Sequence, residues 1–339
     1  MTQTTEVLLT QSFHDNLLAI LREVSPALKI VVHKAKKADD VPDEVWEKAE
    51  VLYTSVVLPE LEQAPNLRWI QFHWTGINHG LDAAILQKPG LVATTLSGMS
   101  AGKVAEHVLM LMLALGLRLP DMLIHQARSD WPEDRWRRFS PRELRDSTVG
   151  IVGYGSIGRQ VARLLHAFGA KVLACKRNAM QPEDTGFIVE GFGDPHGDFV
   201  QRLYPFQAVR SMVKECDFVV VTVPLTPETR GLINQEVFKA MKPSAFLVDV
   251  SRGGVVDQPA LIEALEEKEI AGAGLDVFPE EPIATDNPLW KMPNVIITPH
   301  MAGVTPHYDE RAIAFFAENL KRYLAGEQLY NQIDLEKGY

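Results

Sequence analysis

The sequence predicts an α/β protein built from two doubly wound parallel-sheet domains. Short β-rich runs alternate with helical patterns along nearly all of the 339 residues, which favours parallel sheets covered by helices. A glycine-rich turn near the middle of the chain stands between an apolar run and a helical pattern. The last helical segment has apolar residues at helical spacing and is most simply a return to the first domain. We therefore expect the two ends of the chain to share one domain and the middle to form the other.

The first domain takes its sheet from five short apolar runs. We expect strands at residues 7–10, 30–33, 51–54, 69–72 and 91–94, with helical segments such as 15–24 and 43–48 between them. This alternation predicts a small flavodoxin-like domain over residues 1–100, completed by residues 304–339. A long helix over about 101–117 leads out of it, and the charged stretch that follows lacks a clean period. We therefore expect an extended arm over 118–147.

The second domain, predicted over residues 101–303, supplies the other sheet. Its strands are expected at 148–153, 171–176, 218–223, 245–250, 272–277 and 295–298, and its helices at 208–215, 235–241 and 259–267. The final helix, at about 307–324, follows Pro306 and carries one apolar stripe: Ala312, Phe315, Phe316, Leu320 and Leu324.

The glycines of the turn at 153–158 have the G-x-G-x-x-G spacing between a strand and a helix, the context that gives this motif its function. Gly153 allows the tight turn, Gly155 lets the backbone approach a pyrophosphate, and Gly158 lets the helix pack closely on the strand. Free N–H groups and the helix dipole favour an anion at the start of the helix. The turn therefore predicts a Rossmann dinucleotide-binding domain.

The end of the second strand in this domain indicates which dinucleotide is bound. An NAD site usually has Asp or Glu about 20 residues after the turn, where it holds the ribose 2′-OH. Lys176 and Arg177 stand at that position instead, and two cations suit a 2′-phosphate. We therefore expect NADP(H) as the preferred cofactor, with NAD(H) left open. Residues 178–205 then form an irregular insert, either a surface loop or a lid or rim near the adenine end of the cofactor.

Composition excludes several other classes of protein. The net charge of −10, without a basic stripe, argues against a nucleic-acid binder. Cys175 and Cys216 are too few for a disulfide framework or a cysteine-rich metal site, so no metal is expected. Residues 1–6 lack the basic region of a signal peptide, and the longest apolar stretch, 104–117, is too short to span a bilayer. We expect a cytoplasmic protein without a membrane partner.

Three polar residues, Arg252, Glu281 and His300, each follow a predicted strand of the second domain. Ligands of α/β proteins bind at the carboxyl ends of parallel strands, so all three are expected in the cleft that holds the cofactor. Reduction of a ketone by hydride needs a proton donor for the developing alkoxide, and His suits this near neutral pH. A carboxylate beside the ring favours the imidazolium, and a guanidinium clamps a substrate carboxylate at two points. Each residue alone has an ordinary structural interpretation, but their joint placement predicts a catalytic group.

These motifs together resemble those of the D-isomer-specific 2-hydroxyacid dehydrogenases. The matching segments are GYGSIG (153–158), PLTPETRGLIN (224–234), VDVSRGGVVD (248–257), GLDVFPEEP (274–282) and ITPHMAG (297–303), with WIQFHWTGIN (69–78) and VAEHVLMLML (104–113) in the first domain. In order and spacing the resemblance covers nearly the whole chain. It implies that the first domain binds the substrate and the second binds NAD(P).

The resemblance also implies a role for each candidate residue. Arg252 would bind the substrate carboxylate, and His300 would protonate the carbonyl oxygen with Glu281 as its partner. Backbone N–H groups in the turn of Thr75, Gly76 and Ile77 would bind the same carboxylate. Cofactor contacts are implied for the three glycines and for Ser156 and Ile157 at the pyrophosphate, Lys176 and Arg177 at the 2′-phosphate, Asp276 near the nicotinamide carboxamide, Val250 and Ser251 at the nicotinamide end, and Pro224.

The arm resembles the dimerisation loop of the family. This implies a homodimer, in which Trp131 or Trp136 would reach the substrate pocket of the partner. Asn78 stands where many members have Asp, which leaves the local turn hydrogen bonding open.

The function expected from the residues and the resemblance is an NADPH-preferring reductase of small 2-oxo acids that yields D-2-hydroxy acids. Glyoxylate, hydroxypyruvate or a bulkier 2-oxo acid would be the substrate. An NAD-dependent dehydrogenase such as phosphoglycerate dehydrogenase is a less favoured alternative, because no further regulatory domain follows Tyr339. Formate dehydrogenase is disfavoured because it has Gln at the position of Glu281. A non-enzymatic, nucleotide-sensing protein similar to the transcriptional co-repressors of this fold is the alternative from another class.

Overall fold

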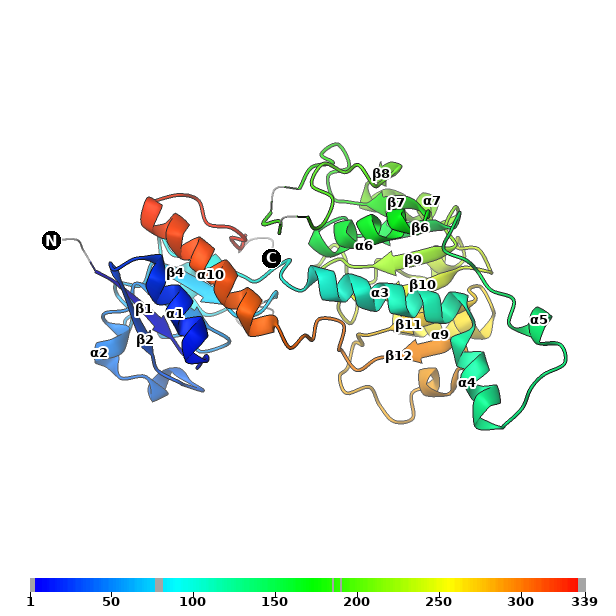
Figure 1. Ribbon diagram of the computed structural model, residues 1–339, viewed down its shortest axis with the longest axis horizontal. Coiled ribbons are helices and arrows are strands. Elements are labelled where there is room, and N and C mark those ends of the chain that lie inside the picture. Colours follow the sequence, from blue (N-terminus) through cyan, green and yellow to red (C-terminus); the bar gives the residue numbers. More distant parts are fainter. Residues whose placement is uncertain (1–3, 77–81, 185, 190, 335–339) are drawn as a thin grey trace. The chain divides into compact units, whose positions relative to one another are not determined.

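The computed structural model describes residues 4–76, 82–184, 186–189 and 191–334 (Figure 1). The chain forms two compact units, residues 1–99 with 305–339 and residues 100–304. Each unit contains one sheet whose named strands are all parallel, of five strands in the first and seven in the second. The predicted α/β class with two doubly wound sheets is therefore confirmed.

The first unit has the strand order β2-β1-β3-β4-β5. Its strands are β1 (Thr5–Leu9), β2 (Leu28–Val32), β3 (Val51–Thr54), β4 (Trp69–Phe72) and β5 (Val92–Thr94). Its helices are α1 (Asp15–Val24), α2 (Asp43–Trp46), α10 (Tyr308–Ala325) and the 3₁₀ turns η1 (Ala38–Asp40) and η2 (Ala84–Gln87).

Apolar side chains cover both faces of this sheet. On one face, Leu17 and Leu21 of α1 and Phe316 of α10 pack with alternate residues of the strands. On the other face, Trp46 and Ile85 pack with the remaining strand residues. Because both faces are covered, the inner strands β3 and β4 are buried along their whole length and are mostly apolar.

The second unit has the strand order β12-β11-β10-β9-β6-β7-β8. Its strands are β6 (Thr148–Val152), β7 (Lys171–Cys175), β8 (Arg202–Tyr204), β9 (Phe218–Val221), β10 (Phe246–Asp249), β11 (Gly272–Leu275) and β12 (Val295–Ile297). Its helices are α3 (Ala101–Gly116), α4 (Leu119–Ala127), α5 (Arg135–Arg138), α6 (Ser156–Ala167), α7 (Val209–Val213), α8 (Gln235–Phe238), α9 (Gln258–Glu266) and the 3₁₀ turns η3 (Phe206–Ala208) and η4 (Pro288–Lys291).

Helices α3 and α6 cover one face of the second sheet, and α7, α8 and α9 cover the other. The chain runs outward from β6 in both directions, through β7 and β8 on one side and through β9 to β12 on the other. The order therefore reverses between β6 and β9. In open α/β sheets, ligands bind at the carboxyl ends of the strands beside such a reversal.

Two predictions about irregular segments are wrong in part. The arm over 118–147 is not simply extended, because it contains α4 and α5, and α4 begins with Pro120 in its first turn. The insert over 178–205 ends in β8, which pairs with β7 at the edge of the sheet. β8, with three residues, and α5, with four, are too short to produce a readable period, and α4 has no buried residue to mark one face.

Within the described ranges, no single helix is long and apolar enough to cross a membrane. Helices α3 and α4 meet the length and composition criteria only when joined across a bend of 65°.

Candidate active site

The glycine turn joins β6 to α6 with geometry that two of its glycines require. Gly153 has φ of +112°, and a Cβ there would lie 2.8 Å from Cγ1 of Val223. A Cβ on Gly158 would lie 2.1 Å from the carbonyl oxygen of Gly153, so only glycine lets α6 approach the strand this closely. At Gly155 a Cβ would meet nothing within 4 Å. The turn is therefore closely packed at its two ends and open in the middle.

The open middle of the turn coincides with the positive end of α6. Gly155 is the N-cap residue, and no side chain caps the helix. Uncapped N–H groups and the helix dipole favour a bound anion, and the space at Gly155 leaves room for one to approach the backbone. Gly155 is exposed and Ser156 and Ile157 are half-buried. These residues fit the pyrophosphate of a dinucleotide.

The insert is fixed to this turn through the buried guanidinium of Arg159 in α6. Its Nη atoms donate to the carbonyl oxygens of Asp194 and Pro182, and its Nε lies 3.4 Å from Oδ2 of Asp184. The hydroxyl of Tyr154, between the first two glycines, donates to the Asp194 carboxylate. Residues 178–205 are interpreted from the sequence either as a surface loop or as a lid or rim near the cofactor. Their anchoring to the glycine turn favours the rim.

Lys176 and Arg177 follow β7 and have different partners. The Lys176 ammonium donates to the carbonyl oxygens of Gln181 and Glu183 in the insert, and its partial burial lowers the pKa of Lys176. Nη2 of Arg177 lies 2.9 Å from Oε2 of Glu228. The structure thus brings the two cations to one strand end, and among the described residues the guanidinium is paired with a carboxylate while the ammonium is bonded to carbonyl oxygens.

His300 and Glu281 form a close hydrogen-bonded pair at the carboxyl edge of the sheet. Nδ1 of His300 lies 2.7 Å from Oε2 of Glu281. The other carboxylate oxygen of Glu281 accepts the backbone N–H of Phe278 at 3.0 Å, which fixes its orientation. Such a contact holds the ring and leaves its Nε2 to face a ligand.

Arg252 follows β10 on the same edge. Its Nη1 donates to the carbonyl oxygen of Ser251 at 2.8 Å. Burial lowers the pKa of Arg252, and the negative charge of Glu281 acts in the opposite direction. Arg252 therefore lies within electrostatic reach of Glu281. The structure brings the three predicted catalytic residues to one edge of the sheet, and a direct hydrogen bond joins two of them.

The second unit also carries the match to known proteins. Residues 109–302 match the family model of the D-isomer specific 2-hydroxyacid dehydrogenase, NAD binding domain, which is more than half of the chain. The chain belongs to this family. It is thus an NAD(P)-dependent oxidoreductase of the D-2-hydroxyacid family, as the resemblance implied.

Two relatives and one solved structure place the chain within the family. A glyoxylate reductase of Thermofilum pendens is 32% identical, with 95% of this chain and 92% of that protein covered. A D-3-phosphoglycerate dehydrogenase of Methanocaldococcus jannaschii is also 32% identical; 97% of this chain is covered, and it spans 59% of that protein. A 2-hydroxyacid dehydrogenase of Xanthobacter autotrophicus, solved with NADPH and MES, is 28% identical with a TM-score of 0.78, covering 99% of this chain and 100% of that chain.

Asp276 holds the loop that carries His300 in this family member. Its buried carboxylate accepts the backbone N–H groups of Met301 and Ala302, both at 2.9 Å, and the hydroxyl of Thr298 at 2.5 Å. The carbonyl oxygen of Asp276 accepts the His300 N–H at 3.0 Å. His300 has φ of +53°, a conformation that costs a non-glycine residue about 1 kcal/mol, and these bonds hold it there.

Two residues of the site were not predicted. His107 in α3 lies 2.9 Å from Oγ1 of Thr298 and 3.5 Å from Oδ1 of Asp276, and burial lowers the pKa of His107. Asp249 at the end of β10 is buried and accepts the N–H and hydroxyl of Ser251. In the sequence, Asp249 could have been noticed as an Asp at the end of an apolar strand, and His107 as a His within an apolar helix.

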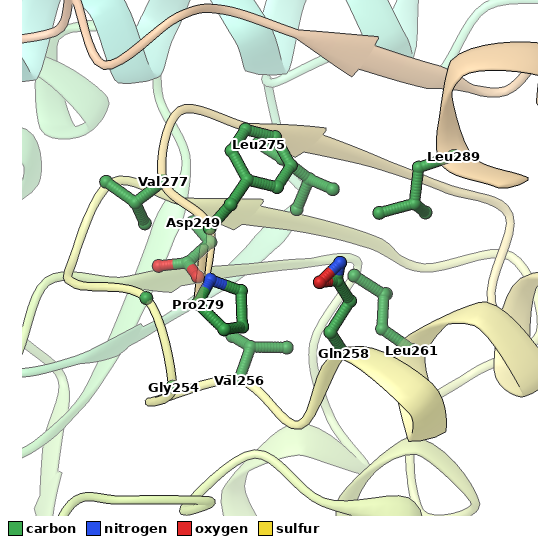
Figure 2. Close-up of a pocket in the computed structure, with 11 residues that line it drawn as sticks. Asp249, Gly254, Val256, Gln258, Leu261, Leu275, Val277, Pro279 and Leu289 are labelled. Atoms are coloured by element: carbon green, nitrogen blue, oxygen red, sulfur yellow. The ribbon is translucent and has the colours of Figure 1, made fainter. Parts of the chain in front are cut away.

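Asp249 also lines a small cavity beneath the Arg252 loop. The cavity has room for about one water molecule, at about 10 Å³. Figure 2 shows Asp249 and Gln258 among apolar side chains, including Leu261, Leu275 and Leu289. His300 and Glu281 do not line it, so this cavity is no part of the proposed reaction site.

Of the remaining predicted cofactor residues, Val250 and Ser251 are buried and Pro224 is exposed. The carbonyl oxygen of Pro224 accepts the hydroxyl of Thr229 at 2.6 Å. Within the described residues, no group of three or more His, Cys, Asp or Glu could hold a metal ion.

The turn after β4 carries the predicted substrate residues of the first unit. Thr75 and Gly76 are exposed, and Ile77 lies outside the described residues. The preceding His73 is buried: its Nδ1 lies 2.8 Å from the Tyr53 hydroxyl, and burial lowers the pKa of His73 to about 4. The ring is therefore neutral near pH 7 and supports the start of the turn.

Proposed function

We propose that the chain reduces small 2-oxo acids, such as glyoxylate or hydroxypyruvate, to D-2-hydroxy acids, with NADPH as the preferred hydride donor. The observation that carries this proposal is the 2.7 Å contact between His300 and Glu281 at the carboxyl edge of a dinucleotide-binding sheet. The relative named glyoxylate reductase supports the substrate class, and the NADPH in the related solved structure supports the cofactor.

NADPH supplies the hydride for the carbonyl carbon when it is bound. His300 donates a proton from Nε2 to the carbonyl oxygen as negative charge develops there. Glu281 holds the ring in place through Nδ1. Arg252 binds the substrate carboxylate through its planar guanidinium, which also orients the carbonyl group. In the reverse direction, His300 accepts the proton of the 2-hydroxyl group.

The cofactor proposal depends on Lys176 and Arg177, which replace the acid that would hold a ribose 2′-OH. Arg177 supplies the guanidinium for the 2′-phosphate, and Lys176 adds positive charge from its fixed position beside the insert. Gly153, Gly155, Ser156, Ile157 and Gly158 would hold the pyrophosphate. Asp276 holds the loop that carries His300. Its contact with the nicotinamide carboxamide stays a prediction.

The first unit is proposed as the substrate domain, with Thr75 and Gly76 offering N–H groups to the substrate carboxylate. A homodimer through residues 118–147 is also proposed. Trp131 and Trp136 are 81% and 80% exposed, and Leu123 in α4 is exposed as well, which is typical of a surface that another chain covers. The cytoplasmic location stays a prediction.

The direct test is reduction of a graded series of 2-oxo acids, with NADPH and NADH compared at each substrate. We expect oxidation of NADPH with at least one member of the series, and a higher kcat/KM with NADPH than with NADH. Charge-assisted bonds to the 2′-phosphate predict a preference of at least about fivefold. Absence of reduction with every 2-oxo acid would contradict the enzyme proposal.

The cofactor preference has its own variant. Lys176→Asp with Arg177→Ala should shift the ratio of kcat/KM values toward NADH, because it removes both cations and restores an acid for the 2′-OH. An unchanged ratio would mean that the 2′-phosphate is bound elsewhere.

A further inference from the structure

Arg177 is held by a carboxylate at the point where the proposed function places a 2′-phosphate. Its Nη2 lies 2.9 Å from Oε2 of Glu228, and the two side chains are 42% and 66% exposed. Glu228 belongs to the turn that follows β9, far from β7 in sequence. The pair therefore joins two loops at the carboxyl edge of the same sheet.

The turn that carries Glu228 is internally fixed. The hydroxyl of Thr229 donates to the carbonyl oxygen of Pro224 and accepts the backbone N–H of Thr226 at 2.8 Å. The backbone N–H of Arg230 closes the turn on the carbonyl oxygen of Thr226 at 2.9 Å. Glu228 thus presents its carboxylate to Arg177 from a rigid base, so the pair costs less conformational entropy than two flexible chains would.

Lys176 has partners of another kind. Its ammonium donates to the carbonyl oxygens of Gln181 and Glu183, which are neutral and belong to the insert. Burial and the neighbouring guanidinium of Arg159 lower the pKa of Lys176. Lys176 therefore connects the end of β7 to the insert. Arg177 already has an anionic partner, Glu228, which a phosphate would have to replace.

We propose that Glu228 is a specificity-determining residue that weakens binding of the 2′-phosphate by competing for Arg177. The inference rests on the proposed binding of the 2′-phosphate by Arg177. Nη2 of Arg177 can donate either to Glu228 or to a phosphate oxygen, so the carboxylate and the phosphate compete for the same N–H donor of the guanidinium. The carboxylate also repels a phosphate dianion brought close to it. A nucleotide without the 2′-phosphate meets neither effect, and Glu228 therefore lowers the preference for NADP(H) over NAD(H).

The test is the affinity of the Glu228→Gln variant for 2′,5′-ADP and for 5′-AMP, measured by isothermal titration calorimetry on the full chain. Gln keeps the shape of the side chain and removes its charge. We expect the dissociation constant for 2′,5′-ADP to fall by about fivefold to tenfold, as removal of one close like charge predicts. The dissociation constant for 5′-AMP should stay within about twofold, because that nucleotide lacks the 2′-phosphate.

Glu236→Gln is the matched control. Glu236 pairs with Arg210 at 3.3 Å, and its side chain is 61% exposed, close to the 66% of Glu228. The control changes the net charge by the same amount in the same unit. Its affinity for 2′,5′-ADP should match that of the unsubstituted chain, and equal affinities in the two Gln variants would overturn the inference.

Arg177→Ala separates failure of the inference from failure of the proposed function. If Arg177→Ala weakens 2′,5′-ADP binding while Glu228→Gln leaves it unchanged, Arg177 binds the phosphate and Glu228 does not oppose it. If neither variant changes that affinity, the 2′-phosphate is not bound by Arg177 and the proposed basis of NADP(H) preference fails as well. In both cases 5′-AMP binding reports that the nucleotide site is intact.

Discussion

Asp249 and Asp276 are buried carboxyl groups at the ends of neighbouring strands, and their surroundings differ. Asp276 accepts three hydrogen bonds from the loop that carries His300. Within the described part of the chain, the Asp249 carboxylate accepts hydrogen bonds from Ser251 alone, on one oxygen. Burial raises the pKa of Asp249, the Ser251 bonds lower it and the negative charge of Asp276 raises it, so that the pKa is about 7. One of the two acids is therefore partly protonated at neutral pH.

The raised pKa of Asp249 predicts a pH-dependent stability. The folded state keeps a proton that the unfolded chain releases near pH 3.8, so this stabilisation is complete below pH 3.8 and is lost as the pH rises through about 7. Asp249→Asn keeps the acceptor oxygen and has no charge. We expect its free energy of unfolding to exceed that of the unsubstituted chain by about 1–3 kcal/mol at pH 8, and by less at pH 5.

Thermal unfolding at the two pH values measures this difference. The variant should unfold about 2 °C or more above the unsubstituted chain at pH 8, with a smaller gap at pH 5. A gap that is equal at both values, or a less stable variant at pH 8, would show that the fold does not raise the pKa of Asp249.

At the residue scale, the placement of the three candidate catalytic residues could be predicted and their supports could not. Arg252, Glu281 and His300 each follow an apolar run that is long enough to be recognised as a strand. His107 gave no such signal, because its partner Thr298 lies 191 residues away and a His in an apolar helix has an ordinary structural interpretation. Contacts over such separations depend on topology, which spacing along the chain does not reveal.

At the element scale, the glycine turn offers a pair of matched substitutions. Gly155→Ala adds a methyl group where nothing lies within 4 Å and where φ is −94°, so the fold should keep its stability. The same methyl group fills the space proposed for the pyrophosphate. Gly158→Ala places a methyl group 2.1 Å from a carbonyl oxygen, so α6 must shift, at a cost of about 1–3 kcal/mol.

Fluorescence titration with NADPH and thermal unfolding distinguish the two variants. Gly155→Ala should unfold at the same temperature as the unsubstituted chain but bind NADPH at least about tenfold more weakly. Gly158→Ala should lose both stability and affinity. If Gly155→Ala binds NADPH with full affinity, the pyrophosphate does not bind at this turn. If Gly158→Ala keeps full stability, α6 is not packed as closely as described.

The insert and the arm mark the limit of prediction at this scale. Residues 178–205 contain Gly and Pro at positions that suggest only a loop, yet Arg159 and Asp194 fix them to α6. The packing extends to the start of α3, where a Cβ on Gly102 would lie 2.9 Å from the Phe192 ring. Buried polar contacts of this kind follow from which elements meet, and no local pattern encodes them.

At the scale of the whole molecule, alternation of strands and helices was sufficient to predict two parallel sheets. Parallel strands need covering helices on both faces, so inner strands such as β9 are apolar runs that are easily recognised in the sequence. The order of the strands follows from the Rossmann motif at Gly153–Gly158 for the second sheet. Membership of the family supplies the reaction class, and the substrate and the cofactor preference depend on loops whose side chains no repeating pattern predicts.

The most direct test of the proposed reaction is reduction of hydroxypyruvate with NADPH that carries deuterium at the transferred position, with His300→Gln as control. We expect D-glycerate with deuterium at C2, and turnover of the variant lower by about 10²–10⁴ while its affinity for NADPH is kept. L-glycerate, a product without deuterium at C2, or unchanged turnover in His300→Gln would contradict hydride transfer with His300 as the proton donor.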